Sequence, residues 1–257
     1  MSYVPTPHVL VEQDGPVTII TLNNPEMRNA FLDDMHEAMQ TIWSDLAVDN
    51  SVRAVVITGA GKAFSAGGDI PGFIRNYEDI DYRRSSLRGA KRLMDAMAEF
   101  PKPLVAAVNG AAVGLGCNVA LLADLVLIGE SAFFADTHVA IGLVAGDGGA
   151  AFWPLYMGML KAKEYIMLGD RIPAKLAVEI GLANRAVADA DLMPEALKLA
   201  HRLAALPRQA VQETKRALNI HIQSAINLVA PFALSAEGES FATDDIRNTI
   251  EGFKKQK

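Results

Sequence analysis

Two loops rich in small residues carry the clearest chemical signal in this sequence. The first runs through Gly59-Ala-Gly-Lys-Ala-Phe-Ser-Ala-Gly-Gly-Asp69, and the second through Val108-Asn-Gly-Ala-Ala-Val-Gly-Leu-Gly-Cys-Asn118. Each loop follows an apolar or β-branched run, so each leaves backbone N–H groups bare at the end of a predicted strand, where a ligand oxygen can approach. Two such groups aimed at one oxygen would form an oxyanion hole, which stabilises a developing negative charge.

Strands and helices must alternate to position these loops. Apolar or β-branched runs predict strands, and apolar residues at helical spacing predict helices. The predicted strands are 17–22, 54–58, 104–108 and 125–128, and the predicted helices are 32–46, 82–100, 118–123 and 153–168. From Leu192 onward the pattern is almost wholly helical. We therefore expect an α/β chain with a core and active site in residues 1–190 and a helical oligomerisation region in residues 191–257.

Composition limits the classes of function that this chain can serve. Of its 257 residues 51% are apolar, which is enough for one large core, and the formal net charge of −6 argues against binding to a phosphate backbone. The single cysteine, Cys117, excludes an internal disulfide, and the five histidines have no ligand spacing, so no metal site is predicted. The apolar runs are expected to be too short to cross a bilayer, and the first ten residues do not resemble a signal peptide. We expect a cytoplasmic protein whose partners are small molecules or its own copies.

The glycines of the two loops do not match nucleotide-binding motifs. After Gly114 and Gly116, the third glycine of a dinucleotide fingerprint is replaced by Val119. A P-loop requires Ser or Thr after Gly61-Lys62, where this chain has Ala63. Either loop taken alone could serve only to allow a tight turn.

Taken together, the loops and three further segments resemble the crotonase superfamily, the enoyl-CoA hydratase/isomerase family. The resemblance covers nearly the whole chain and depends on the order and spacing of its motifs. They are Asn24-Pro-Glu-Met-Arg-Asn-Ala-Phe31, Gly61-Lys-Ala-Phe-Ser-Ala-Gly-Gly-Asp-Ile70, Lys102-Pro-Leu-Val-Ala-Ala-Val-Asn-Gly110, Gly181-Leu-Ala-Asn184 and the closing helix to Phe253. The resemblance implies a spiral of ββα units with a C-terminal α-helical trimerisation region. It also implies a homotrimer or a dimer of trimers.

The resemblance further implies which backbone atoms and side chains bind an acyl-CoA. The two oxyanion donors fall on the backbone N–H groups of Ala66 and Leu115, and the second lies near the start of a helix, whose dipole adds positive potential. Coenzyme A would enter as part of the substrate, with no tightly bound cofactor. The residues implied to bind it are Met27, Arg28, Ala30, Asp69, Ile70 and, at the end of the chain, Lys254 or Lys255. For the basic residues, the alternative is a solvated surface charge.

The catalytic side chains depart from the family pattern. A typical hydratase uses two glutamates, and the aligned positions in this chain hold Asn118 and His138. Asparagine cannot exchange a proton at neutral pH, whereas histidine can act there as an acid or a base. Asn118 could orient a water or a carbonyl, or it could simply cap or line its helix.

A second departure concerns Asp147, which follows His138 by nine positions. This spacing resembles the oxocamphor hydrolase branch, which cleaves a carbon–carbon bond in cyclic β-diketones, and Glu237 matches a glutamate of that branch. An aspartate bonded to the histidine would fix its tautomer and stabilise the imidazolium. The alternative for Asp147 is a turn residue between glycines, and we expect the same turn role for Asp136.

Three functions of different kinds follow from these observations. The one we favour is an acyl-CoA enzyme that holds a thioester enolate at Ala66 and Leu115, with His138 moving the proton. The second is a CoA-independent hydrolase in which His138 and Asp147 activate water to cleave a β-diketone. The third is a homologue that keeps the fold and the ligand cavity but has lost efficient catalysis.

Overall fold

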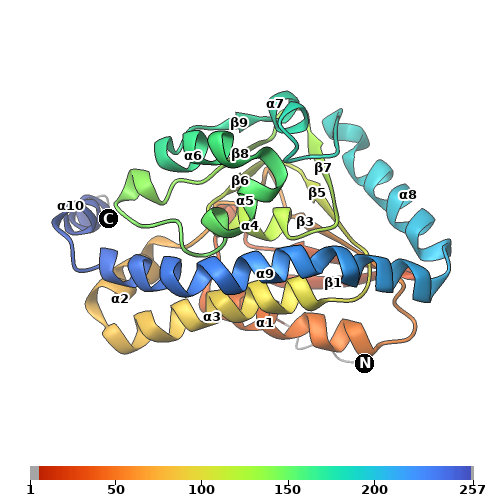
Figure 1. Cartoon of the computed structure of the whole chain (residues 1–257), viewed down its shortest axis with the longest axis horizontal. Helices are drawn as coiled ribbons and strands as arrows, with labels where there is room; N and C mark the ends of the chain where they lie inside the picture. The colour runs from red at the N-terminus through yellow and green to blue at the C-terminus, as the bar shows by residue number, and fades with distance from the viewer. Residues whose placement is uncertain (1–5, 256–257) are drawn as a thin grey trace.

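Two β-sheets enclosed by helices form the frame of the protein in the computed structural model, which describes residues 6–255 (Figure 1). The larger sheet has the strand order β1-β2-β3-β5-β7-β10, in which only β1 runs antiparallel to its neighbour. Its strands are β1 (Val9–Asp14), β2 (Val17–Leu22), β3 (Ala54–Gly59), β5 (Leu104–Val108), β7 (Leu125–Gly129) and β10 (Arg185–Val187). Strands β3 and β5 are buried along their whole length, so the expected apolar runs are central strands.

The smaller sheet carries the ends of the two loops. Its order is β4-β6-β8-β9, with strands β4 (Ala63–Ser65), β6 (Ala111–Val113), β8 (Phe133–Ala135) and β9 (Ile172–Pro173). The chain passes from the larger sheet to the smaller one at two tight corners. A Cβ atom on Gly59 would lie 2.2 Å from the Ala63 carbonyl oxygen, and one on Gly110 would lie 2.1 Å from that of Lys62. These corners therefore require glycine.

Each pair of strands is followed by helix, which gives the expected repeat of ββα units. The helices of the core are α1 (Asp33–Val48), α2 (Ile70–Glu78), α3 (Ile80–Glu99), α4 (Leu115–Leu121), α5 (Gly149–Met157), α6 (Met159–Leu168) and α7 (Ala174–Glu179). Three short 3₁₀ segments, η1 (Pro25–Met27), η2 (Val139–Ile141) and η3 (Asp189–Asp191), complete it. The fold is a crotonase-type α/β structure, as its solved relatives below confirm.

Some predicted elements differ from the structure. The helix expected over 153–168 is two helices, because Gly158 adopts φ +78° and interrupts it between α5 and α6. Helix α4 begins at Leu115 instead of residue 118. The strands of the smaller sheet were not predicted, because runs of two or three residues are too short to show a period of two.

Three helices follow the core: α8 (Leu192–Ala205), α9 (Arg208–Ser240) and α10 (Asp244–Lys255). Ala196 and Ala200 of α8 are fully buried in one cluster with Val56 and Val105 of the larger sheet. Helix α9 runs beside α3 and α5 (Figure 1), and α10 contacts α2. The segment after residue 190 is thus helical, and it packs directly on the core.

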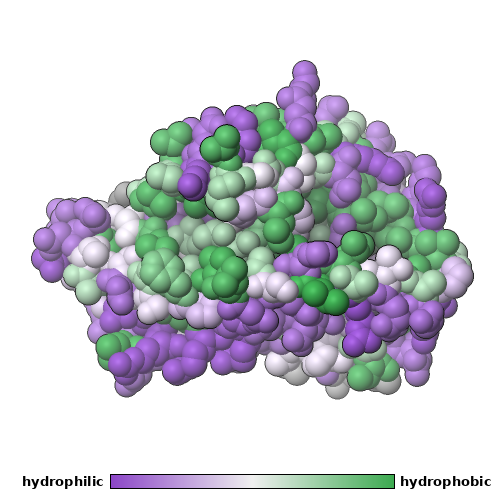
Figure 2. All heavy atoms as spheres, viewed as in Figure 1, coloured by the Kyte–Doolittle hydropathy of each residue, from purple (hydrophilic) through white to green (hydrophobic). Residues whose placement is uncertain are grey.

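The surface of α9 is unusually apolar. Figure 2 shows hydrophobic side chains over α9 and the helices above it, with a hydrophilic band along α3 below. By length and composition alone, α9 is apolar enough to cross a membrane, although the sequence analysis found no such run. Core helices of soluble proteins that are equally apolar are mostly buried, whereas only 22% of the most apolar stretch of α9 is buried within this chain. Its large exposed residues are Leu218, Ile220, Leu228 and Phe232.

Candidate active site

A cavity of about 530 Å³ lies where the two small-residue loops meet. The loops touch backbone to backbone, since a Cβ atom on Gly67 would lie 2.7 Å from the Val113 carbonyl oxygen and 3.6 Å from the Leu115 nitrogen. Gly67 also has φ +85°, a conformation that favours glycine. The small residues of both loops are therefore required for this contact. It brings the residues that follow β4 and the start of α4 to one wall of the cavity.

The two expected oxyanion donors line the cavity but differ in their hydrogen bonding. The Leu115 N–H is the first of helix α4 and has no acceptor within residues 6–255. The Ala66 N–H donates to the Arg28 carbonyl oxygen at 2.9 Å. A ligand oxygen can thus take the Leu115 donor directly, whereas at Ala66 it has to compete with that carbonyl.

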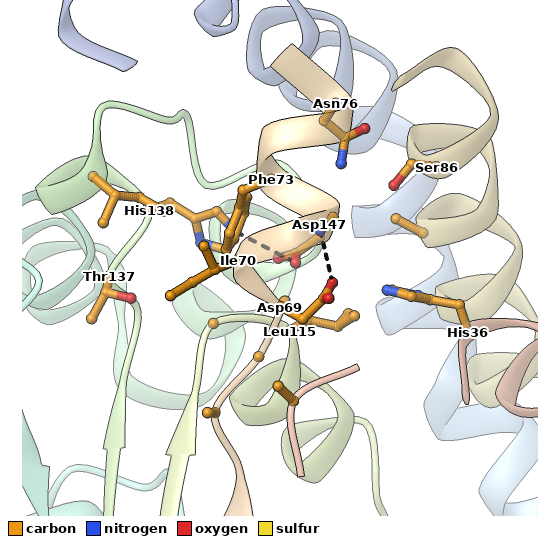
Figure 3. A pocket seen from close by; sticks show the side chains of 18 of the residues that line it. His36, Asp69, Ile70, Phe73, Asn76, Ser86, Leu115, Thr137, His138 and Asp147 are labelled. Atoms are coloured by element: carbon orange, nitrogen blue, oxygen red, sulfur yellow. Dashed lines mark hydrogen bonds and ion pairs between the residues drawn. The ribbon is translucent and has the colours of Figure 1, made fainter. Parts of the chain in front are cut away.

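His138 is held between two carboxylates at the edge of the cavity. Its Nδ1 lies 2.6 Å from Asp136 Oδ1, and its Nε2 lies 3.5 Å from Asp147 Oδ2. Asp136 directly follows strand β8, and it also accepts the backbone N–H of His138. Figure 3 shows His138 and Asp147 joined across the back of the cavity. The tight partner of His138 is Asp136, which the sequence analysis treated as a turn residue.

Asn118 supports this arrangement from behind. Its Nδ2 donates to Asp147 Oδ1 at 2.7 Å, and its Oδ1 accepts from Trp153 Nε1 at 2.9 Å. Asn118 is only 1% exposed and does not line the cavity. The role open to Asn118 is therefore to position Asp147, and the expectation that it orients a water or carbonyl is not met by its location.

Glycines around Asp147 make room for the acidic groups. A Cβ atom on Gly149 would lie 2.3 Å from Asp136 Oδ2, and one on Gly146 would lie 2.4 Å from Glu237 Oε2. These distances are far below van der Waals contact. The glycines of the segment Ala145-Gly-Asp-Gly-Gly149 therefore let the carboxyl groups of Asp136 and Glu237 approach its backbone closely.

Glu237 of α9 joins the site as the third acidic side chain. It lines the cavity, is 8% exposed, and its Oε2 atom is buried without a hydrogen-bond partner within residues 6–255. Burial raises the pKa of Glu237 to about 8, although nearby His138 opposes this shift. Glu237 therefore carries a proton at neutral pH and can donate a hydrogen bond.

The electrostatics of the histidine follow from its two neighbours. Burial alone would lower the pKa of His138, but the carboxylates of Asp147 and Asp136 raise this pKa well above the ordinary value. Burial would raise the pKa of Asp147, but His138 and the Asn118 amide hold it below the ordinary value. At neutral pH the site thus contains an imidazolium between two aspartates, beside an uncharged glutamic acid.

The residues expected to bind coenzyme A line the same cavity, except for Lys254 and Lys255. Met27, Arg28, Ala30, Asp69 and Ile70 all line it. Asp69 also caps α2 by accepting the Gly72 N–H at 3.1 Å. Lys254 does not line the cavity, and its ammonium group pairs with Glu78 instead.

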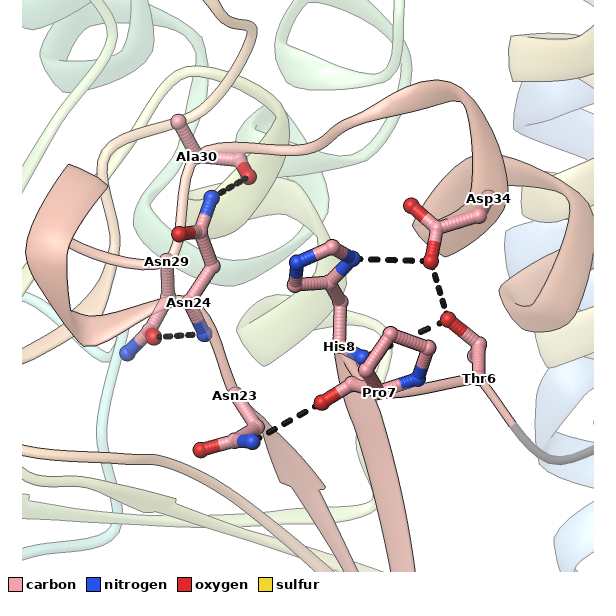
Figure 4. A network of polar contacts seen from close by, with 8 residues as sticks. All are labelled: Thr6, Pro7, His8, Asn23, Asn24, Asn29, Ala30 and Asp34. Carbon is pink, nitrogen blue, oxygen red and sulfur yellow. Dashed lines mark hydrogen bonds and ion pairs between the residues drawn. The ribbon is translucent and has the colours of Figure 1, made fainter.

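A buried asparagine network holds the loop that presents Arg28 (Figure 4). Arg28 and Asn29 both have positive φ, at 53° and 56°. The Asn29 side chain accepts the Asn24 N–H at 2.8 Å and donates to the carbonyl oxygens of Ala60 and Ala63. The side chain of Asn29 therefore ties this left-handed turn to the first small-residue loop, an interaction that the sequence analysis did not predict.

Comparisons with known proteins agree with this architecture. Residues 12–257 match the family model described as "Enoyl-CoA hydratase/isomerase". The chain is 33% identical to the short-chain-enoyl-CoA hydratase of Clostridium acetobutylicum, over 96% of this chain and 94% of that protein. It is 32% identical to the crotonyl-CoA hydratase of Syntrophomonas wolfei, over 96% and 94%.

Solved structures give the same assignment. The crystal structure of an enoyl-CoA hydratase/isomerase from Mycobacterium paratuberculosis superimposes with a TM-score of 0.94 at 46% identity, covering 97% of this chain and 100% of that one. The match extends over both sheets and the C-terminal helices. The chain belongs to the enoyl-CoA hydratase/isomerase family of the crotonase superfamily.

Proposed function

We propose that this protein is an enzyme that acts on an acyl-CoA thioester through an enolate, with His138 moving the proton. The observation that carries the proposal is the position of His138 beside the Leu115 N–H. A Cβ atom on Gly114, the residue before Leu115, would lie 3.5 Å from His138 Cε1. An oxyanion bound at Leu115 would thus have a proton-transfer group next to it.

His138 can act as a general acid in the resting state, because the carboxylates beside it keep its ring protonated. The imidazolium can donate its Nε2 proton to the α-carbon of an enolate, and the neutral imidazole that remains can then take a proton from water or substrate. Asp136 holds Nδ1 throughout, and Asp147 lies on the Nε2 side. This division of roles differs from the two-glutamate pattern of a typical hydratase.

Coenzyme A binding and turnover test the proposal directly. Calorimetric titration with CoA and acetyl-CoA should show saturable binding, and the salt is kept near physiological because contacts to the CoA phosphates would be ionic and screened by salt. A screen of enoyl and acyl thioesters should then find turnover that His138→Ala abolishes. Binding without any turnover would support the third function, a ligand-binding homologue that has lost efficient catalysis. Rapid hydration of crotonyl-CoA that survives His138→Ala would contradict the role of His138.

Carbon–carbon cleavage of a β-diketone is the second candidate, and the buried Asp136–His138–Asp147 arrangement favours it. Once His138 has lost its Nε2 proton, the neutral ring between its carboxylates can take a proton from water as the water attacks one ketone, and the departing enolate can bind at the Leu115 N–H. Failure to bind CoA, together with hydrolysis of a cyclic β-diketone, would favour this candidate over the first.

We further propose that copies of the chain assemble as a trimer or a dimer of trimers through the exposed apolar side chains of α9 and α6. Phe232, Leu228 and Leu160 are 78%, 82% and 84% exposed, which is costly for large apolar side chains in water. Light scattering should give three or six times the chain mass of 27.6 kDa. Paired Leu228→Glu and Phe232→Glu changes should lower that mass.

A further inference from the structure

Three polar side chains on the cavity wall formed by α1, α2 and α3 have no hydrogen-bond partner within residues 6–255. They are His36, Asn76 and Ser86. Within the described part of the chain, no hydrogen bond is made by the ring nitrogens of His36. The side-chain amide of Asn76 and the hydroxyl of Ser86 make none either. In Figure 3 these three residues lie on one side of the cavity and His138 lies on the other.

Several neighbouring polar groups on the same helices are paired with one another. Arg92 donates to Gln40 at 2.8 Å, and both Tyr82 and Arg75 donate to Asp33. The Asn76 Oδ1 atom is fully buried without a partner. An unsatisfied buried polar atom costs about 1–3 kcal/mol, so a partner from a ligand would be favourable.

The chemistry of this wall selects uncharged oxygen groups. Burial lowers the pKa of His36, although Asp33 and Asp147 oppose the shift, so the ring is neutral at physiological pH. A neutral imidazole has one donor and one acceptor, and Ser86 and Asn76 add further donors and acceptors. A carboxylate on the ligand would meet the negative charge of Asp147, whereas a ketone or hydroxyl would not.

We propose that His36, Asn76 and Ser86 form a subsite for a second polar oxygen group, a ketone or hydroxyl, carried by the acyl part of the substrate. The inference rests on the proposed acyl-CoA function. Phe73 and Leu87, which also line the cavity, would contact the carbon skeleton between this group and the thioester. The substrate class is therefore an oxygenated acyl-CoA, in contrast to a plain alkyl thioester.

Calorimetry with matched ligands tests this subsite. Hexanoyl-CoA is compared with 5-oxohexanoyl-CoA and 5-hydroxyhexanoyl-CoA on the wild-type protein and on His36→Leu, Ser86→Ala and Asn76→Ala. The wild type should bind at least one oxygenated thioester about 10-fold more tightly than hexanoyl-CoA, as one or two hydrogen bonds would give. The ratio should fall toward one in His36→Leu and decrease in the other two variants.

A control variant and two outcomes make the result decisive. Ser85→Ala, next to Ser86 but outside the cavity lining, should leave the affinity ratio unchanged. Equal wild-type affinities for hexanoyl-CoA and both oxygenated thioesters, or a preference that survives in all three subsite variants, would overturn the subsite.

Titration with CoA alone separates the subsite from the proposed function. If CoA binds, the ratios above decide the subsite by themselves. If CoA does not bind, the acyl-CoA function fails, and the subsite is then decided by comparing the uncharged 2,2-dimethylcyclohexane-1,3-dione with 2,2-dimethylcyclohexanone. Tighter binding of the dione that is lost in His36→Leu would support it, and equal binding would refute it.

Discussion

His138 Nδ1 lies 2.6 Å from Asp136 Oδ1, so the carboxylate that orients this histidine comes from two residues earlier in the chain. Asp147, the partner expected from the sequence, lies farther away at 3.5 Å and faces Nε2. The two aspartates therefore have separate parts. Asp136 fixes the ring and its tautomer, and Asp147 lies where a proton leaves or arrives.

Asp136→Asn should lower kcat/KM by on the order of 10²-fold, because it removes the charge that holds His138. The same change should lower the pKa of His138, since one of the two carboxylates that raise it is lost. The pH dependence of kcat/KM and an NMR titration of the imidazole report both effects. Asp170→Asn, at an exposed position, is the control, and an unchanged His138 titration would refute the assignment.

His138→Ala should reduce turnover by about 10²- to 10⁴-fold, the usual contribution of a general acid or base. The circular dichroism spectrum should change little, but the unfolding midpoint should fall, because Asp136 and Asp147 lose the buried positive charge between them. His201→Ala, whose ring bonds to Asp14 far from the cavity, provides a matched control. Wild-type turnover by His138→Ala would exclude this residue from the chemistry.

Glu237→Gln should change how stability depends on pH. The folded protein keeps a proton on Glu237 up to a pKa of about 8, whereas the unfolded chain releases it near 4.5. Unfolding therefore becomes easier as the pH rises from about 4.5 to about 8. Urea unfolding at a series of pH values measures the free energy of unfolding. Its decrease between these pH values should be smaller in Glu237→Gln than in the wild type, whereas the exposed control Glu239→Gln should show the full decrease. An identical decline in wild type and Glu237→Gln would show that Glu237 is ionised in the folded protein.

Gly149→Ala should impair catalysis by displacing Asp136. The added Cβ atom would lie 2.3 Å from Asp136 Oδ2, so either the Asp136 carboxylate or the backbone at residue 149 has to move. We expect at least a 10-fold loss of kcat/KM, because small displacements in a site are costly. Gly252→Ala, where nothing lies within 4 Å of the added atom, should leave kcat/KM unchanged. Full activity in Gly149→Ala would mean that the position of Asp136 is unimportant.

Asn29→Ala should destabilise the protein by roughly 2–4 kcal/mol, because it removes three hydrogen bonds, two of them buried, and leaves their backbone partners unsatisfied. It should also weaken CoA binding, since Asn29 holds the turn that presents Arg28. Asn23→Ala, which removes one exposed bond to Pro7, should cost much less. Urea unfolding and CoA titration measure the two effects, and equal stability losses in both variants would contradict the proposed anchor.

The sequence by itself determined the elements and loops whose signals are local. Runs such as 104–108 show a strand directly, and small residues at Gly59, Gly67 and Gly110 indicate where backbone must pass close to backbone. The identity of His138 in place of a carboxylate was also readable, because it depends only on residue type and motif order. These features are set within a few residues, so the fold class and the cavity loops could be predicted.

Only the tertiary structure decided which groups share the cavity and in what charge state. Asn118 meets Asp147 across 29 positions, Glu237 enters from α9, and His36 faces the site from α1. Burial then keeps Glu237 protonated, whereas the carboxylates of Asp136 and Asp147 keep His138 protonated. Burial and long-range contacts cannot be inferred from residue type and spacing. The roles of Asp136, Asn118 and His36 could therefore be assigned only from the folded structure.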